Sequence, residues 1–212
     1  MNYYDNKKGW IEVICGPMFA GKTEELIRRI KRMDYAKKNY LVFKPKIDNR
    51  YSTTEVVSHN KKAVKAINIS HGSDIKRHLK PNTQAIVIDE AQFFDESLLK
   101  YVVELANEGY RVICAGLDTD FRGEPFGVMG PLLAVATQVT KLTAICSVCG
   151  EEATRTQRII DGQPAFYDDP VILVGANDSY EARCICCHEV RREKWFTLYE
   201  GGNQAGKKSI WY

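Results

Sequence analysis

The stretch of sequence best suited to chemistry lies near the start of the chain, where a glycine-rich segment ends in a lysine and a threonine. Residues 16–23 read GPMFAGKT and match the phosphate-binding pattern G-x-x-x-x-G-K-[ST], between an apolar run and a helical pattern. In such a loop, backbone N–H groups surround phosphate oxygens, the lysine charges the space between the β- and γ-phosphates, and the threonine hydroxyl binds Mg²⁺. The predicted ATP-binding residues of this loop are Gly16, Pro17, Met18, Phe19, Ala20, Gly21, Lys22 and Thr23.

Two acidic residues, Asp89 and Glu90, follow directly after the apolar run AIVI at residues 85–88. An acid at the end of such a strand is placed to hold the magnesium ion or its water. Glu90 then lies beside the metal site, where a kinase or an ATPase needs a general base. The alternative is a solvated loop acid, and the position next to Asp89 favours the base.

Seven cysteines form the third chemical feature of the chain. An odd number of cysteines with no export signal argues against a disulfide framework and for a reducing compartment. Two C-x-x-C pairs are present, Cys146 with Cys149 and Cys184 with Cys187. Four thiolates make a closed tetrahedral site, so these residues are predicted to bind a structural Zn²⁺. A redox dithiol is the alternative, but two separate pairs suit a metal better.

The second cysteine pair has more than one possible ligand. Cys186 and His188 lie within the same short segment, and the two-residue gap favours Cys184 with Cys187. The 34 residues between the pairs exceed the usual spacing of about 15–20 in a zinc ribbon. Residues 150–183 lack helical periodicity and include Gly162 and Gly175, so they are predicted to form a loop that closes over the substrate.

Short apolar runs alternate with helical patterns through residue 140, which predicts an α/β fold with a mostly parallel sheet and a P-loop core. The predicted strands are Trp10–Cys15, 40–43, Ala85–Ile88, 111–115 and 141–146. The predicted helices are 23–36, 70–79 and 97–108, the first with its basic residues 28, 29, 31 and 32 on a solvated face. The predicted domains are a nucleotide-binding domain at 1–142, a zinc-binding domain that covers the substrate at 143–192, and a flexible tail at 193–212.

Composition limits the class of protein. The 212 residues carry a net charge of only +3, which gives no sign of a nucleic-acid partner. No apolar run approaches the ~20 residues of a membrane helix, and the first residues do not resemble a secretory signal. A cytoplasmic location without membrane contact is therefore expected.

Three kinds of function fit these motifs: a kinase for a small acceptor, an ATPase motor on a nucleic acid, and a zinc module whose P-loop switches binding. Aromatic residues favour a small planar acceptor. Phe93 follows one predicted strand, and Phe121 and Phe126 follow another, so all three are expected on the ligand side of a parallel sheet. Phe94 is expected to belong to the core.

Six stretches together resemble the thymidine kinases of the cytosolic, zinc-containing type (type II). They are GPMFAGKT at 16–23, FKPKIDNRY at 43–51, DEAQFF at 89–94, LDTDFRGEPFG at 117–127, KLTAICSVC at 141–149 and YEARCICCH at 180–188. The resemblance covers about residues 10–190, in order. It implies transfer of the ATP γ-phosphate to the 5′-hydroxyl of thymidine, with Glu90 as the base. It also implies a homotetramer and feedback inhibition by dTTP.

The resemblance further implies roles for residues that the motifs alone do not assign. Asp48, Arg50, Asp89 and Gln92 would join the P-loop in binding ATP and Mg²⁺. Thymine would lie among Phe93, Phe121 and Phe126, with its 5-methyl group near Met18, Leu117, Thr156 and Tyr180. Main-chain groups of Val171, Ile172, Leu173, Val174 and Gly175 would hold the edge of the base.

Overall fold

The computed structural model describes residues 8–46, 55–57, 63–172 and 178–192. Its centre is a six-stranded sheet in the order β5-β2-β6-β7-β1-β8, in which every neighbouring pair is parallel. The strands are β1 (Trp10–Cys15), β2 (Tyr40–Pro45), β5 (Ile67–Ile69), β6 (Ala85–Ile88), β7 (Arg111–Gly116) and β8 (Gln138–Lys141). The predicted α/β class with a mostly parallel sheet is confirmed.

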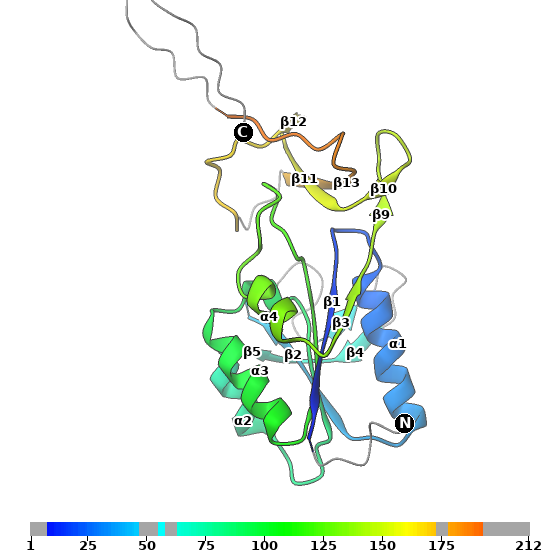
Figure 1. The fold of residues 1–212 in the computed structure, drawn as a ribbon, viewed down its shortest axis with the longest axis vertical. Helices are drawn as coiled ribbons and strands as arrows, with labels where there is room; N and C mark the ends of the chain where they lie inside the picture. Colours follow the sequence, from blue (N-terminus) through cyan, green and yellow to red (C-terminus); the bar gives the residue numbers. More distant parts are fainter. Residues whose placement is uncertain (1–7, 47–54, 58–62, 173–177, 193–212) are drawn as a thin grey trace, which may run out of the picture.

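Helices cover both faces of this sheet (Figure 1). Helix α1 (Lys22–Tyr35) packs on one face, where Leu26 and Ile30 meet the inward residues of β1, β2, β6 and β7. Helices α2 (Ile75–His78), α3 (Ser97–Asn107) and α4 (Met129–Val135) pack on the other face. Because the central strands are buried on both sides, β6 reads as an unbroken apolar run.

The sixth strand lies earlier in the chain than predicted. The expected strand at 141–146 is wrong: β8 occupies Gln138–Lys141 beside β1, and a separate short strand β9 (Ala144–Ile145) follows. Strand β8 pairs on one side only, and its burial pattern is largely exposed. An edge strand needs no apolar run, so its sequence QVTK gives little signal.

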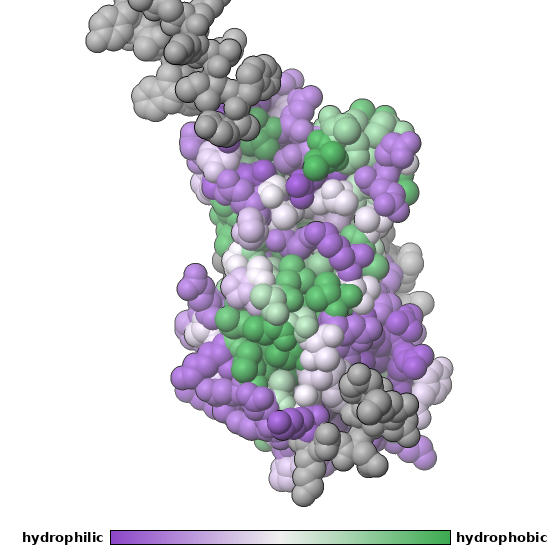
Figure 2. Space-filling model, in the orientation of Figure 1, coloured by the Kyte–Doolittle hydropathy of each residue, from purple (hydrophilic) through white to green (hydrophobic). Residues whose placement is uncertain are grey.

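Apolar side chains are exposed where α4 and β8 meet. Figure 2 shows this apolar surface over α4 and the adjoining strand. Val135 is 41% exposed and Val139 is 46% exposed. The edge of the parallel sheet therefore carries apolar as well as polar groups.

The chain after β8 folds into small antiparallel sheets beyond the carboxyl end of β1 (Figure 1). Strand β9 pairs with β10 (Glu152–Ala153), and β11 (Arg155–Ile160) pairs with both β12 (Gln163–Pro164) and β13 (Asp178–Arg183). The prediction that all of 150–183 is a loop is wrong, because backbone hydrogen bonds order parts of it as the strands β10, β11, β12 and β13. A further hairpin joins β3 (Glu55–Val57) to β4 (Ala63–Lys65).

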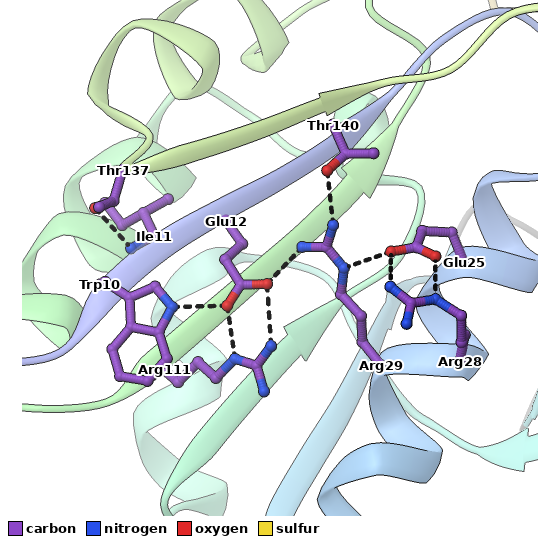
Figure 3. Close-up of polar contacts among 9 residues, drawn as sticks. All are labelled: Trp10, Ile11, Glu12, Glu25, Arg28, Arg29, Arg111, Thr137 and Thr140. Atoms are coloured by element: carbon purple, nitrogen blue, oxygen red, sulfur yellow. Dashed lines mark hydrogen bonds and ion pairs between the residues drawn. The ribbon is translucent and has the colours of Figure 1, made fainter. Parts of the chain in front are cut away.

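One basic residue of α1 is buried rather than solvated. Arg29 is 6% exposed and forms an ion pair with Glu12, which is 2% exposed on β1 (Figure 3). Arg111 also pairs with Glu12 at 2.7 Å, and the Trp10 indole N–H donates to the same carboxylate at 2.6 Å. Burial opposes ionisation of Glu12, but these partners outweigh it and lower the pKa of the carboxyl group.

The predicted solvated face of α1 is therefore wrong at Arg29. A helical pattern shows which residues are polar, but it does not show that an acid stands opposite one of them. The guanidinium also donates to Thr140 at 2.7 Å and to Glu25 at 2.9 Å. Arg29 thus links α1 to β1 and to the edge strand β8 (Figure 3).

Candidate active site and metal centre

The P-loop connects β1 to α1 with a backbone that only glycine adopts easily at two positions. Gly16 has φ 142° and Gly21 has φ 80°. A Cβ atom on Gly16 would lie 2.3 Å from the carbonyl oxygen of Leu142, so no larger residue fits there. Helix α1 starts at Lys22 with no side-chain cap, which leaves its N-terminal N–H groups available to an anion.

Lys22 lies among carboxylates. Its ammonium group donates to the carbonyl oxygen of Pro17 at 2.6 Å. Burial lowers the pKa of Lys22, while the negative charges of Glu90, Asp89 and Asp118 oppose that shift. A phosphate chain in the loop would therefore meet one buried cation with three acids nearby, an arrangement that suits a metal-bound rather than a free triphosphate.

Asp118 is an acid of this site that the sequence analysis missed. It follows β7 as Asp89 follows β6, and it is 5% exposed. Lys141 lies 2.9 Å from its carboxylate, and this ion pair raises the pKa of Lys141. The available signal was the position of Asp118 two residues after the buried strand β7, since parallel strands that neighbour each other end at the same edge.

Glu90 has an unusual backbone conformation. Its φ of 52° and ψ of 44° lie in the left-handed region, which non-glycine residues rarely adopt. Its N–H donates to Asp89 Oδ1 at 3.0 Å, and its carboxylate accepts a hydrogen bond from the Gln92 side chain. Glu90 is half-buried, so its carboxylate is accessible from the ligand edge of the sheet.

Two of the predicted aromatic residues are in contact. The rings of Phe93 and Phe126 meet edge to face at 5.7 Å. Phe121 is buried, with the guanidinium groups of Arg122 and Arg158 each 5.4 Å from its ring centroid. Because Arg158 belongs to β11, Phe121 lies where the parallel sheet meets the C-terminal sheets.

The C-terminal sheets also touch the P-loop directly. The Met18 N–H donates to the hydroxyl of Thr156, a buried residue of β11, at 3.0 Å. Ala20 packs against the apolar cluster that contains Cys146 and Cys184. Tyr180 is opposite Arg158 in the β11–β13 ladder, and Leu117 is buried just after β7.

Several predicted site residues cannot be placed. Asp48 and Arg50 lie outside the described residues, as do Leu173, Val174, Gly175 and the predicted tail at 193–212. Val171 and Ile172 lie at the end of a described segment. The carbonyl oxygen of the preceding Pro170 accepts a hydrogen bond from Arg158, which brings this segment towards Phe121. Phe94 is 5% exposed within the core, as expected.

The four paired cysteines converge on one point. The sulfur atoms of Cys146, Cys149, Cys184 and Cys187 all lie within 4.8 Å of one another. Cys149 Sγ and Cys184 Sγ are 3.6 Å apart. Tetrahedral Zn²⁺ with Zn–S bonds of about 2.3 Å places its sulfurs about 3.8 Å apart. Geometry and donor type therefore fit Zn²⁺.

The other groups of the second pair point elsewhere. Cys186 is exposed, and the ring Nε2 of His188 is 2.8 Å from the carbonyl oxygen of Phe121. Burial would raise the pKa of Cys146, but backbone hydrogen bonds, from Cys184 first, outweigh burial and lower it to about 6, whereas the hydrogen bond to Cys184 raises the pKa of Cys187 to about 12. These shifts oppose one another, so the metal assignment rests on the convergence of the four sulfurs.

Substitution of Cys187 and of Cys186 should show which of the two binds the metal. Cys187→Ser is expected to lose Zn²⁺ and to unfold at lower temperature, because three thiolates no longer close the site. Cys186→Ser is the matched control and should keep both. Metal content per chain and thermal unfolding of the two variants measure this. The reverse result would make Cys186 the fourth ligand, and a metal-free, fully active wild type would remove the site altogether.

A glycine-rich loop at a helix N-terminus, acids after neighbouring parallel strands and a buried lysine define a P-loop nucleotide-binding protein. A sequence model of the family described as "Thymidine kinase" matches residues 9–188. The chain belongs to the thymidine kinase family.

A solved structure with a similar arrangement is Pif1 helicase from Candida albicans. The likeness has a TM-score of 0.37 at 14% sequence identity and covers 64% of this chain. The chain spans only 36% of that helicase. Within the described residues, no helix has both the length and the apolar character that a membrane span needs.

Proposed function

We propose that the protein is a type II thymidine kinase that transfers the γ-phosphate of ATP to the 5′-hydroxyl of thymidine. The product is dTMP, which places the reaction in nucleotide salvage. The observation that carries this proposal is the juxtaposition of Lys22 with the carboxylates of Asp89 and Glu90 within a chain of the thymidine kinase family. Phosphoryl transfer depends mainly on positioning and charge neutralisation, and these residues supply both.

Each residue of the phosphate site then has a stated task. The P-loop N–H groups and Lys22 bind the β- and γ-phosphates, and Thr23 with Asp89 would hold Mg²⁺, which neutralises charge on the phosphates when bound. The 5′-oxygen forms a bond to the γ-phosphorus as the bond to the bridging oxygen of ADP breaks. Glu90 takes the proton of the 5′-hydroxyl. We assign Asp48 and Arg50 to the same nucleotide site, and Gln92 to it through its contact with Glu90 rather than through contact with ATP.

The nucleoside would lie between the parallel sheet and the C-terminal sheets. We assign the thymine ring to the space beside Phe93, Phe121 and Phe126, where the edge-to-face pair and the buried ring supply apolar walls. The remaining lining would come from Met18, Leu117, Thr156, Tyr180 and the main chain of residues 171–175. In this scheme residues 1–142 bind ATP, and residues 143–192 bind zinc and cover the nucleoside.

We further propose that the protein is a homotetramer, that dTTP inhibits it and that it is cytoplasmic. The family resemblance supports all three. The exposed Val135 and Val139 beside the unpaired edge of β8 also suit contact between copies.

A phosphorylation screen tests the proposed function. With ATP and Mg²⁺, thymidine should be the best acceptor and deoxyuridine the second, because reading one methyl group is worth only about 1–3 kcal/mol. Deoxycytidine should be very poor, because its ring presents the wrong donors and acceptors to fixed backbone groups. Product analysis for the four common deoxynucleosides and deoxyuridine measures the order. If the protein hydrolyses ATP steadily but phosphorylates no nucleoside, the proposed kinase function is wrong. Stimulation of that hydrolysis by DNA would then favour a motor or a switch.

A further inference from the structure

Gln92 connects the ends of two neighbouring strands through both ends of its side-chain amide. Its Nε2 donates to Glu90 Oε2 at 2.5 Å, just beyond β6, and its Oε1 accepts from the Leu117 N–H at 3.0 Å, just beyond β7. The residue is 2% exposed. Both ends of the amide are thus engaged inside the protein.

The orientation of this amide follows from its partners. The Leu117 N–H can only donate, so the amide oxygen must face Leu117 and the NH₂ group must face Glu90. Two glycines leave the space that the residue needs. A Cβ on Gly116 would lie 2.5 Å from Gln92 Oε1, and a Cβ on Gly127 would lie 2.7 Å from the Gln92 carbonyl oxygen. Larger residues at either position would displace Gln92.

Glu90 needs such support, because its left-handed backbone is unfavourable for a residue with a Cβ. Conformations of this kind persist only where the surroundings hold them, and they occur often at functional sites. Gln92 lies two residues further on in the turn η2 (Ala91–Phe93) and reaches back to the carboxylate. The left-handed backbone of Glu90 and the hydrogen bond from Gln92 thus together fix the position of the Glu90 side chain.

We propose that Gln92 is a positioning residue that holds the carboxylate of Glu90 oriented towards the acceptor hydroxyl. This inference rests on the proposed function, because it concerns the proton transfer assigned there to Glu90. The hydrogen bond from the Gln92 amide removes the rotational freedom of a side chain that must meet the hydroxyl within hydrogen-bond distance.

Two variants of similar size separate positioning of Glu90 from support of Leu117. Gln92→Glu keeps an oxygen for the Leu117 N–H but replaces the donor to Glu90 with a second acid. Gln92→Met removes both bonds. Both variants should lose kcat by roughly 10–100-fold, a part of the ~10²–10⁴ that a general base contributes. The KM values for thymidine and ATP should stay within about threefold, because ground-state binding is untouched.

The split between kcat and KM gives a readout that a structural role would not move. Single-turnover rates of dTMP formation at saturating thymidine and ATP should fall with kcat in both variants, because the chemical step is slowed. Thermal melts measure the cost to the fold, which comes from a second buried acid beside Glu90 in Gln92→Glu and from a buried Leu117 N–H without its partner in Gln92→Met. A wild-type kcat in Gln92→Glu, or a loss that appears only in the KM values, would overturn the inference and leave Gln92 a structural residue.

A measurement without turnover keeps this test apart from the proposed function. Carbon-13 NMR of glutamate-labelled protein follows the Glu90 carboxylate, assigned by its absence in Glu90→Gln. At neutral pH its signal should be sharp in wild type, where one orientation is held, and broadened by side-chain exchange in Gln92→Met, and equal line widths would overturn the inference. If wild type phosphorylates no nucleoside, the proposed function fails alone, and this line width still decides whether Gln92 acts on Glu90.

Discussion

Glu90→Gln is expected to lower kcat for thymidine phosphorylation by roughly 10²–10⁴, with the KM for thymidine largely unchanged. Glutamine has the shape of glutamate and keeps an oxygen that can accept the hydrogen bond from Gln92, so the turn should stay intact. It does not accept a proton at neutral pH. Steady-state rates with saturating ATP, and single-turnover rates of dTMP formation, measure the chemical step.

A nearby acid provides the control. Glu96 lies six positions further along the chain and is exposed, so Glu96→Gln should keep wild-type rates. Near wild-type turnover in Glu90→Gln would remove Glu90 from the base role. A loss that appears only in the KM for thymidine would instead make Glu90 a binding residue.

Glu12→Gln is expected to produce the largest loss of stability, roughly 3 kcal/mol. Removing one partner of a buried ion pair costs about 3–5 kcal/mol, and we take the lower end because Arg29 keeps Glu25 and Thr140 as partners. At about 2–4 °C per kcal/mol for a chain of this size, Tm should fall by roughly 6–12 °C. Calorimetry or thermal melts at pH 7 measure the change.

The effect of Glu12 should depend on pH in one direction. The pKa of Glu12 is lowered in the folded protein from its ordinary value of 4.5. Its stabilisation is therefore fully present above pH 4.5 and is lost as the pH falls through the folded pKa. The Tm difference between wild type and Glu12→Gln should narrow below pH 4.5.

An exposed ion pair gives the matching control for Glu12. Glu104 pairs with Lys76 at 3.0 Å, and both side chains are more than a third exposed, so Glu104→Gln should lower the stability far less than Glu12→Gln. Equal losses for the two variants, or a Tm gap that stays constant down to pH 3, would contradict a buried-charge explanation.

Much of the phosphate site follows from sequence because it depends on local signals. The predicted bounds of β1 and β6 match the structure, since a strand buried on both faces is apolar throughout. The two cysteine pairs are local as well, and their sulfurs meet as predicted. The family resemblance is shown, whereas the roles of the individual site residues stay predictions.

The features that the sequence did not predict all depend on contacts between distant residues. Helix α4 contains Gly130 and Pro131, which have low helix propensity, yet Met129 and Leu132 are fully buried and hold it against the sheet. Strand β11 gives no strong pattern because its polar Gln157 is also buried, with partners in the segment after the second cysteine pair. Local propensity predicts neither the packing of α4 against the sheet nor the hydrogen bonds of the buried Gln157.

The hydrogen bond from the Met18 N–H to Thr156 connects the P-loop to the strands that carry the four-cysteine site. Thr156 belongs to β11, β11 pairs with β13, and β13 ends directly before Cys184. If zinc changes the affinity for ATP by some factor through this path, ATP must change the affinity for zinc by the same factor. Where each ligand strengthens the binding of the other, nucleotide-loaded protein would hold the metal more tightly, and removal of zinc would weaken nucleotide binding.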